Sequence, residues 1–398
     1  MRILLITYNF LQFYNPSSIQ ARRFFLELAN RGYKITIITS RDRTNIIFHH
    51  ENISVYQLFS FKKKLFNKVS SLLRFHELNF MPDWDLFLWN PFVWFKLFLL
   101  RKEKFDFVHT ISAPASTQLI PLLWKNKGNT KWIAQFYDPW VDNSYIKLRF
   151  LFFQKLNLYF EKMVAQNADL IIHTNRYVEN HWNNRYGETF IKNKLILPLC
   201  IKASSDGEGL KKFSNENGKI TISHIGSIYG KRNLNALIDA LNILFNQDKT
   251  LFEKLSVDLV GFLLATEISK IKKLDFAFIF NFIGEVSYVE SMNYMVKSSL
   301  LVLIEEESDE SLFFPSKLTD YLSLQKPIIG IVPKHCVSRD ILQQNGHFCF
   351  EYSDIDGIAN YIKIFPNNVN SPEKINSKVS ELYTENVITT YLEAILRL

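Results

Sequence analysis

Cysteine is scarce in this sequence. The 398 residues contain three cysteines, Cys200, Cys336 and Cys349, and no two of them form a CxxC pair. Structural zinc sites and disulfide scaffolds need clustered or regularly spaced cysteines. The sequence therefore argues against both kinds of site, and it fits a protein of a reducing compartment.

Glycine is also rare, with 13 copies, and its placement excludes one common class of nucleotide-binding protein. The apolar run Arg2–Thr7 predicts a strand, and Ser17–Asn30 predicts the helix that follows it. The loop between them, Tyr8–Ser18, contains no GxGxxG. Because that motif is the phosphate-binding fingerprint of dinucleotide-dependent dehydrogenases, the sequence excludes this class.

Long apolar segments are missing as well. The longest candidates, such as Asn90–Leu100 and Phe150–Phe153, are interrupted by lysine or are too short to span a bilayer. Residues 1–40 alternate strand, helix and strand, and they lack the charged region and apolar core of a secretory signal. We therefore expect a cytoplasmic protein without a signal peptide.

The sequence does contain a regular alternation of strand-length apolar runs and helical patterns. In the first half, strands are predicted at Arg2–Thr7, Lys34–Ser40, Ile53–Leu58, Phe105–Thr110, Lys131–Phe136, Ala168–Thr174 and Lys194–Leu199. In the second half they are predicted at Lys219–Ile225, Val257–Val260, Phe276–Ile283, Leu300–Ile304, Ile328–Val332 and His347–Phe350. Continuous apolar strands separated by helices are typical of parallel sheets covered on both faces.

This pattern predicts the α/β class, with two Rossmann-like doubly wound domains. A polar stretch that bears Gly and Ser and has no apolar period separates them, which predicts a linker. We place an N-terminal domain at 1–202, the linker at 203–218 and a C-terminal domain at 219–370. The remaining segment, 371–398, is predicted to be largely helical and could pack back on the N-terminal domain.

Charge is divided unevenly along the chain. Residues 1–200 carry 27 Lys and Arg against 14 Asp and Glu, a net of +13; residues 201–398 carry 20 against 25, a net of −5, which together give the +8 of the whole chain. Phe61–His76 interleaves basic and apolar residues, and the aromatic stretch Trp84–Phe98 follows it. Such a helix is typical of segments that lie on an anionic membrane surface. The alternative is a core-facing helix with a solvated basic side.

Two loops of the second half are suited to phosphate. Pro315–Lys317 opens a helical pattern, and a helix start presents unpaired amides and the positive end of the helix dipole. His224–Gly230 ends a strand and is followed by Lys231 and Arg232. Because ligands of open α/β sheets bind beyond the carboxyl ends of the strands, both loops could hold one diphosphate. The alternative is two ordinary loops with solvated cations.

With these residues in place, the chain resembles the family 4 glycosyltransferases of the GT-B fold, in which two Rossmann-like domains face each other across a cleft. The resemblance covers both halves in the family's order. Its separate segments are Pro82-Asp83, Asp138-Pro139-Trp140, Glu161–Thr174, Gly226–Arg232 and Phe314–Pro327.

The resemblance implies that the C-terminal domain holds a nucleotide-diphosphate sugar, UDP- or GDP-linked. Gly226 would lie close to the donor phosphates, Arg232 and Lys317 would act catalytically on the diphosphate, and Asp320 would bind ribose. The implied donor-binding set is Gly226, Ser227, Lys231, Arg232, Phe314, Pro315, Ser316, Lys317, Leu318 and Asp320.

The family's Glu-x7-Glu pattern is incomplete here. Asp320 stands at its second Glu, but the spacing places Leu312 at the first, and Glu307 or Glu310 would substitute only if the loop shifts. This departure leaves the choice of sugar open. No metal ion is expected, because fixed donors and cationic side chains can stabilise the leaving diphosphate. Two Asp-x-Asp strings, Asp83-Trp84-Asp85 and Asp354-Ile355-Asp356, resemble the metal-binding motif of the other major glycosyltransferase fold, but the second lies beside Gly357 and predicts a turn or a helix start.

The acceptor side falls in the first half. The resemblance implies a site residue after the strand Phe105–Thr110, where Ser112 stands, with His109 earlier on the strand. A lone histidine on a strand is also a common core residue. Asp138 follows another strand and could accept a hydrogen bond from an acceptor hydroxyl, which gives it a catalytic role, or it could only cap the following turn.

The sequence therefore predicts a retaining glycosyltransferase that moves a sugar from a nucleotide-sugar to a lipid-linked glycan in surface polysaccharide biosynthesis. Its expected partners are the donor, that acceptor and an anionic membrane surface on the cytoplasmic side, and not nucleic acid. Two alternatives remain open. One is another GT-B enzyme such as a sugar-nucleotide epimerase, and the other is a noncatalytic sugar- or nucleotide-binding subunit.

Overall fold

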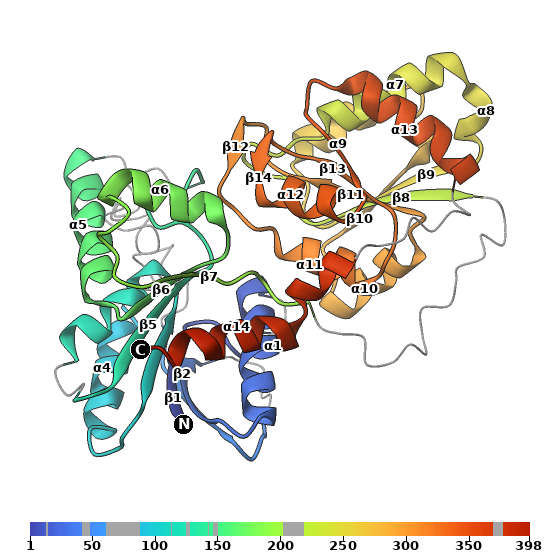
Figure 1. Ribbon diagram of the computed structural model, residues 1–398. Coiled ribbons are helices and arrows are strands. Elements are labelled where there is room, and N and C mark those ends of the chain that lie inside the picture. The colour runs from blue at the N-terminus through green and yellow to red at the C-terminus, as the bar shows by residue number, and fades with distance from the viewer. Residues whose placement is uncertain are drawn as a thin grey trace, which may run out of the picture. The chain divides into compact units, whose positions relative to one another are not determined.

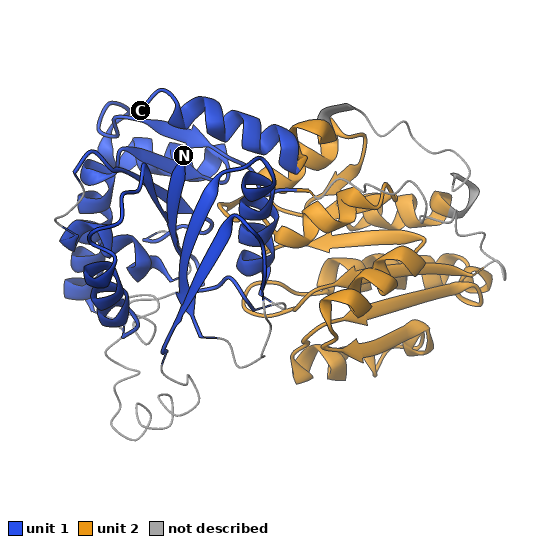
Figure 2. Ribbon diagram, turned by 90° about the horizontal axis from the view of Figure 1, so that it is seen from below, with its two compact units in different colours: residues 1–200, 384–398 blue, residues 201–383 orange. Residues whose placement is uncertain are grey.

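A computed structural model describes residues 1–12, 15–41, 48–60, 88–112, 114–124, 128–141, 143–145, 150–201, 219–368 and 377–398. These residues form two compact units (Figure 2). Unit 1 comprises Met1–Cys200 together with Thr384–Leu398, and unit 2 comprises Ile201–Tyr383. The segment Phe61–His76, the residues Trp84 and Phe87, and the linker 203–218 lie outside the described residues.

Unit 1 is built on a parallel sheet of seven strands in the order β3-β2-β1-β4-β5-β6-β7. The strands are β1 (Arg2–Ile6), β2 (Lys34–Ser40), β3 (Ile53–Leu58), β4 (Phe107–Ile111), β5 (Lys131–Phe136), β6 (Leu170–His173) and β7 (Lys194–Ile196). All seven coincide with the strands predicted from apolar runs. The strand order reverses beside β1, so the carboxyl ends of β1 and β4 flank the crevice where doubly wound sheets bind ligands.

The helices of unit 1 follow from local signals in the sequence. They are α1 (Pro16–Asn30), α4 (Asn90–Leu99), α5 (Leu151–Asn167), α6 (Arg176–Tyr186) and α14 (Thr384–Ile395), with 3-10 turns η2 (Ala115–Leu119) and η3 (Pro121–Leu123). Asn15 caps α1 because its side chain accepts a hydrogen bond from the Ser17 amide, and Pro16 suits the first helical turn. Asn175 caps α6 in the same way.

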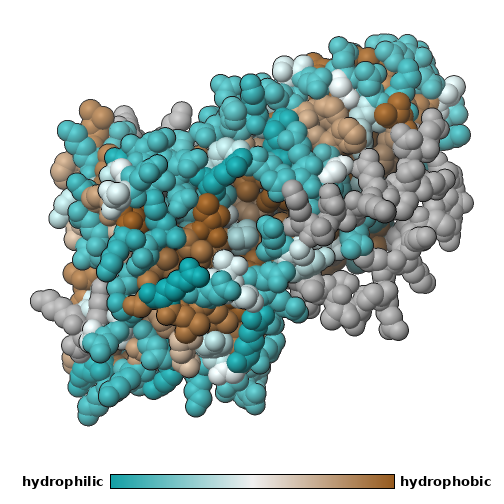
Figure 3. Space-filling view, in the orientation of Figure 1, coloured by the Kyte–Doolittle hydropathy of each residue, from teal (hydrophilic) through white to brown (hydrophobic). Residues whose placement is uncertain are grey.

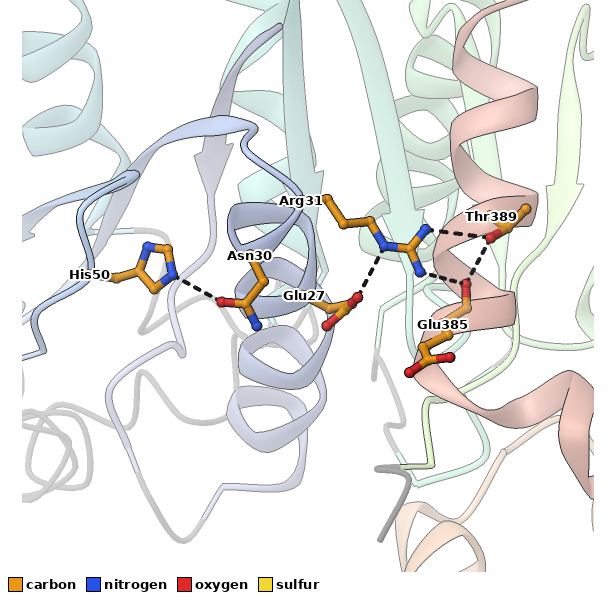
Figure 4. A network of polar contacts seen from close by, with 6 residues as sticks. All are labelled: Glu27, Asn30, Arg31, His50, Glu385 and Thr389. Atoms are coloured by element: carbon orange, nitrogen blue, oxygen red, sulfur yellow. Dashed lines mark hydrogen bonds and ion pairs between the residues drawn. The ribbon is translucent and has the colours of Figure 1, made fainter. Parts of the chain in front are cut away.

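The last helix, α14, belongs to unit 1 and packs beside α1 (Figure 1). Figure 4 shows the polar part of this contact. Arg31, just after α1, donates to the Glu385 carbonyl at 3.1 Å and to the Thr389 hydroxyl at 3.4 Å, while its Nε pairs with Glu27 at 3.0 Å. The apolar side of α14 is fully buried and comprises Val387, Ile388, Tyr391 and Ile395.

Unit 2 contains a parallel sheet of six strands in the order β10-β9-β8-β11-β13-β15, with a small pair β12-β14. The strands are β8 (Ile220–Ile225), β9 (Leu255–Val260), β10 (Phe280–Gly284), β11 (Leu300–Ile304), β12 (Glu310–Ser311), β13 (Ile328–Ile331), β14 (His335–Cys336) and β15 (Phe348–Phe350). The α/β class and the two doubly wound sheets predicted from the sequence are thus confirmed.

The helices of unit 2 are α7 (Asn235–Gln247), α8 (Lys249–Phe252), α9 (Ala265–Ile271), α10 (Tyr288–Lys297), α11 (Ser316–Ser323), α12 (Val337–Gln344) and α13 (Ile355–Asn368), with 3-10 turns η4 (Ala277–Ile279) and η5 (Ser377–Leu382). A hydrophobic core joins α7 and α13 to the sheet and includes Leu241, Val302 and Ile358. The Asp354 carboxylate accepts the Gly357 amide at 3.0 Å, so it caps the start of α13.

Candidate active site

Three neighbouring strands of unit 2 reach glycine at their carboxyl ends. They are Gly226 after β8, Gly261 after β9 and Gly284 at the end of β10. A Cβ on Gly261 would lie 2.7 Å from the carbonyl carbon and oxygen of Gly226, so only glycine lets these two backbones approach so closely. This packing holds the loop after β8 at the sheet edge where ligands of such folds bind.

Lys317, in the first turn of α11, lies directly over Gly226. A Cβ built on Gly226 would stand 2.5 Å from Lys317 Nζ, and Gly226 has a φ of +146° that disfavours other residues. The same ammonium lies 3.4 Å from His224 Nε2. The two loops predicted to bind phosphate therefore meet, and glycine leaves room for the lysine.

The ring of His224 is neutral and oriented. It is fully buried, and its Nδ1 lies 3.0 Å from the Val302 carbonyl. Burial, and after it the positive charge of Lys317, hold the pKa of His224 well below its usual range. A neutral ring that donates from Nδ1 leaves Nε2 as an acceptor for the Lys317 ammonium. In the sequence, His224 stands near the end of a predicted strand, and no local pattern indicates this contact with Lys317.

Charged groups converge on Lys317. Burial, and then the Arg232 guanidinium, lower its pKa to about 7, while Glu305 acts in the opposite direction. Arg232 follows the β8 loop, and its guanidinium lies 5.5 Å from the Tyr229 ring centroid. Two cations beside unpaired helix-start amides form an environment that favours a bound anion.

Glu305 is the charged member of this cluster that sequence reasoning missed. It directly follows β11, is only 1% exposed, and its amide donates to the Ile331 carbonyl at 3.1 Å. Burial raises its pKa, whereas the Ser338 hydroxyl and the charge of Arg232 oppose that change. The run Glu305-Glu306-Glu307 looks in the sequence like a solvated charged loop. The position of Glu305 at the carboxyl end of a fully apolar strand is the one feature of the sequence that could have identified it as a site residue.

The start of α11 supplies backbone donors. Pro315 precedes the helix in an extended conformation and has no amide hydrogen. The Leu318 amide donates to the Pro315 carbonyl at 3.0 Å, so within this turn it is already engaged. The amides of Ser316 and Lys317 precede any intrahelical acceptor. Of the implied set, Phe314, Pro315 and Leu318 are buried, and they shape the turn with their side chains.

The other members of the implied donor set lie near this cluster in sequence but differ in exposure. Ser227 is half-buried beside Gly226, and Lys231 is exposed. Asp320 is buried one turn into α11 and accepts a hydrogen bond from the Tyr288 hydroxyl at 3.0 Å. The structure thus gathers Gly226, Arg232 and Lys317, and it fixes Asp320 from a second helix, α10.

On the acceptor side, His109 lies in the closed core of unit 1. Its Nδ1 is 3.0 Å from the Tyr391 hydroxyl and its Nε2 is 2.9 Å from Gln135 Oε1. Burial lowers the pKa of His109 to about 3, although the Gln135 side chain acts in the opposite direction. Both ring nitrogens are therefore engaged, which favours the core interpretation of this residue.

Ser112 and Asp138 follow neighbouring strands of the same sheet, β4 and β5. The buried Ser112 hydroxyl accepts the Tyr137 amide at 3.1 Å, and Asp138 is exposed. The loop after Asp138 is fixed by α5, since Trp140 Nε1 donates to Asn157 at 2.9 Å and the Val141 amide donates to Glu161 at 3.1 Å. Asp138 therefore stands on a rigid loop.

Glu161 is itself held by an ion pair. It is fully buried and accepts hydrogen bonds from Arg185 and from the Tyr186 hydroxyl, each at 2.8 Å. A buried carboxylate that is fully paired contributes rigidity and not reactivity. Glu161 therefore joins the loop after Trp140 to α5 and α6.

Two searches of the described residues bear on metals and membranes. Within them, no cluster of three or more His, Cys, Asp or Glu side chains could coordinate a metal ion. Among their helices, none combines the length and the apolar character that crossing a bilayer requires.

Comparison with known proteins agrees with these features. Residues 18–196 match the family model described as Glycosyltransferase Family 4. Among curated proteins, none matches the chain in sequence.

Solved structures match over the whole length. The lipopolysaccharide outer core galactosyltransferase WaaB is 12% identical with a TM-score of 0.64, covering 100% of this chain and 99% of its own. S. aureus TarM, in complex with UDP, is 11% identical with a TM-score of 0.63, covering 99% and 100%. An α,α-trehalose-phosphate synthase (UDP-forming) from Burkholderia xenovorans is 9% identical with a TM-score of 0.69, covering 100% of both chains.

These likenesses establish the fold, and the family model adds the chemistry. Residues 18–196 form a domain of glycosyltransferase family 4, and both sheets match structures of the GT-B fold; the enzymes of this family are retaining and metal-independent and use nucleotide-sugar donors.

Proposed function

We propose that this enzyme transfers a sugar from a UDP- or GDP-linked donor to a lipid-linked glycan in surface polysaccharide biosynthesis. The proposal that the enzyme binds this donor rests on the cluster of Lys317, Arg232 and Gly226 at the carboxyl end of β8. Unit 2 is the donor domain in this proposal. The donor diphosphate lies over Gly226 and receives the amides of Ser316 and Lys317.

Catalysis in this proposal is stabilisation of the leaving diphosphate. As the bond to the anomeric carbon lengthens, negative charge develops on the departing phosphate oxygen, and fixed donors placed there lower the barrier. Lys317 and Arg232 supply the positive charge. Asp320, oriented by Tyr288, binds the ribose hydroxyls.

Unit 1 is the acceptor domain in this proposal. It corresponds to the N-terminal domain 1–202 expected from the sequence, together with the C-terminal helix α14. Asp138 and Ser112 line the acceptor side at the ends of β5 and β4. The anchoring of the Asp138 loop by Glu161 and Trp140 supports this assignment, since a carboxylate that orients an acceptor hydroxyl must itself be fixed.

The same unit carries the proposed membrane surface. Three aromatic residues of α4, Phe92, Phe95 and Phe98, are exposed and recur at helical spacing, and Phe95 is 65% exposed. Brown patches also interrupt the polar surface along α5 (Figure 3), where Leu151 and Phe152 are exposed. Exposed aromatics beside a strongly basic sequence fit a peripheral protein on the cytoplasmic face of an anionic membrane.

Donor binding is tested first by thermal unfolding without added metal, in the presence of UDP, GDP, ADP or inorganic phosphate. A ligand that binds only the folded state stabilises it by about 2.7 kcal/mol at a hundred times its Kd. We expect one nucleoside diphosphate to raise Tm selectively. No rise with any of them would contradict the proposed donor site and favour a noncatalytic subunit.

Membrane binding is tested by flotation with anionic vesicles at low and high salt. We expect binding at low salt that weakens as salt screens the charges. Phe95→Ser should reduce it. The matched control is Phe278→Ser, because Phe278 is 67% exposed but belongs to unit 2. Equal binding of both variants would contradict the assignment of this surface.

A further inference from the structure

The burial of the Glu305 carboxylate is energetically unfavourable. Glu305 is fully buried, and among the described residues neither of its carboxylate oxygens has a hydrogen-bond partner. The hydroxyls of Ser338 and Ser311 lie near enough to oppose the rise in the pKa of Glu305, but neither the Ser338 hydroxyl nor the carboxylate is in a hydrogen bond of normal geometry with a described residue. A buried carboxylate that lacks hydrogen bonds destabilises a fold, so such groups tend to mark functional sites.

The backbone leaves Glu305 no freedom to move out. Its amide extends the ladder between β11 and β13, and its carbonyl accepts the Tyr352 hydroxyl at 2.7 Å. β11 lies between β8 and β13 in the sheet, so the side chain starts beside the loop that holds His224 and Gly226. Fold geometry therefore fixes this carboxylate at the donor cluster.

The charged groups of the proposed donor site that interact with Glu305 are cations. The titratable groups that interact with it are Arg232, Lys317, Cys336, Cys349 and Tyr352; those that act on Lys317 are Arg232, Glu305 and His224. The charge of Arg232 disfavours the Lys317 ammonium, whereas the charge of Glu305 favours it.

We propose that Glu305 is a positioning residue, the internal counter-ion that keeps Lys317 charged and in place beside Arg232 until a donor diphosphate takes over. This inference rests on the proposed donor site. It goes further, because it assigns a role to a residue outside the implied donor set and predicts that donor binding draws a proton onto Lys317.

The signature of a counter-ion is a change in the pH dependence of binding. Diphosphate favours protonated Lys317, so UDP or GDP should bind less tightly as pH rises through about 7, the pKa of free Lys317. Glu305→Gln keeps the shape but removes the charge that supports the ammonium. The midpoint should then move to lower pH by about one unit.

The low-pH limit separates this role from a merely structural one. Below the midpoint both proteins carry protonated Lys317, and the variant lacks a negative charge near the phosphates. We expect it to bind the nucleoside diphosphate as tightly as the wild type or more tightly there. Damage to the fold would instead weaken binding at every pH. Glu253→Gln, which removes an exposed carboxylate of the same unit, should leave the midpoint unchanged.

The experiment is a titration with UDP and GDP between pH 5 and pH 9. If the wild type binds a nucleotide and the midpoint of its pH dependence is the same in Glu305→Gln, the counter-ion role is wrong but the donor site stands. If the wild type binds neither nucleotide, the donor site itself fails. Calorimetry of the wild type in buffers of different ionisation enthalpy gives a second readout that needs no Glu305 variant. Proton uptake is expected near pH 8 and should be lost in Lys317→Arg, and its absence in the wild type would contradict the inference.

Discussion

Two buried histidines on strands, His109 on β4 of unit 1 and His224 on β8 of unit 2, have different surroundings. Each is neutral because burial lowers its pKa. His109 has both nitrogens paired with core groups, Tyr391 and Gln135, whereas His224 pairs one nitrogen with Val302 and turns the other to the Lys317 ammonium. The same residue on the same kind of strand thus closes a core in one unit and supports a charged site in the other.

The largest expected effect comes from removing the ammonium of Lys317, which contacts His224 Nε2. Lys317→Met should lower kcat by about 10²–10³-fold, since one fixed donor to a developing charge contributes about 3 kcal/mol to lowering the barrier. The measurement is sugar transfer at saturating donor. Lys254→Met, at an exposed lysine of unit 2, is the control and should retain activity. A Lys317 variant as active as this control would contradict the catalytic assignment.

Exchanging both histidines for leucine separates the two roles. His109→Leu leaves Gln135 Oε1 and the Tyr391 hydroxyl unpaired in the core, and should reduce the free energy of unfolding by roughly 2–4 kcal/mol without changing UDP or GDP affinity. His224→Leu should weaken nucleotide binding as well, because Lys317 loses its acceptor. Urea unfolding and nucleotide titration of both variants give the comparison. Equal nucleotide affinity of the His109→Leu and His224→Leu variants would show that the contact between His224 and Lys317 is not part of the donor site.

Acid should destabilise the protein through its buried histidines. The pKa values of His109 and His173 are lowered to about 3 and that of His347 to about 4, in each case mainly by burial. Between these values and about 6.5 the unfolded chain binds more protons than the native state, so stability falls as pH falls, by up to ~1.4 kcal/mol per pH unit for each group. His109→Gln should make the slope shallower by one proton. An unchanged slope in unfolding experiments from pH 7 to pH 4 would contradict this.

A smaller effect is expected at Asp320, whose carboxylate accepts a hydrogen bond from the Tyr288 hydroxyl. Tyr288→Phe removes the hydroxyl that donates to Asp320, and should weaken UDP or GDP binding by about 1 kcal/mol. Inorganic phosphate binding should be unaffected, because the change concerns the ribose and not the phosphates. Loss of phosphate binding in this variant would place Tyr288 elsewhere in the site.

The sequence allowed most of this fold to be predicted, because apolar strands separated by helices are a local signal. It also indicated both phosphate loops, since Gly226 and Lys317 stand where the rule for parallel sheets places ligands. It did not reveal the fate of either histidine. His109 depends on Tyr391, 282 positions away, and His224 depends on how far Lys317 reaches over a glycine. Glu305 was missed because nothing local in the run of three glutamates shows that Glu305 and Glu306 are buried and Glu307 is exposed; the bonding of Glu305 to Ile331 on the neighbouring strand fixes its place.

The position of α14 has a consequence for how the protein is made. Tyr391 completes the core around His109, yet it is synthesised only after the whole of unit 2. At about 5–20 residues per second, the ribosome spends on the order of 10–40 s between the last residue of the first stretch of unit 1 and the helix that closes it. During this interval the side of α1 that packs against α14 is uncovered, so the first unit to emerge is the last to be completed.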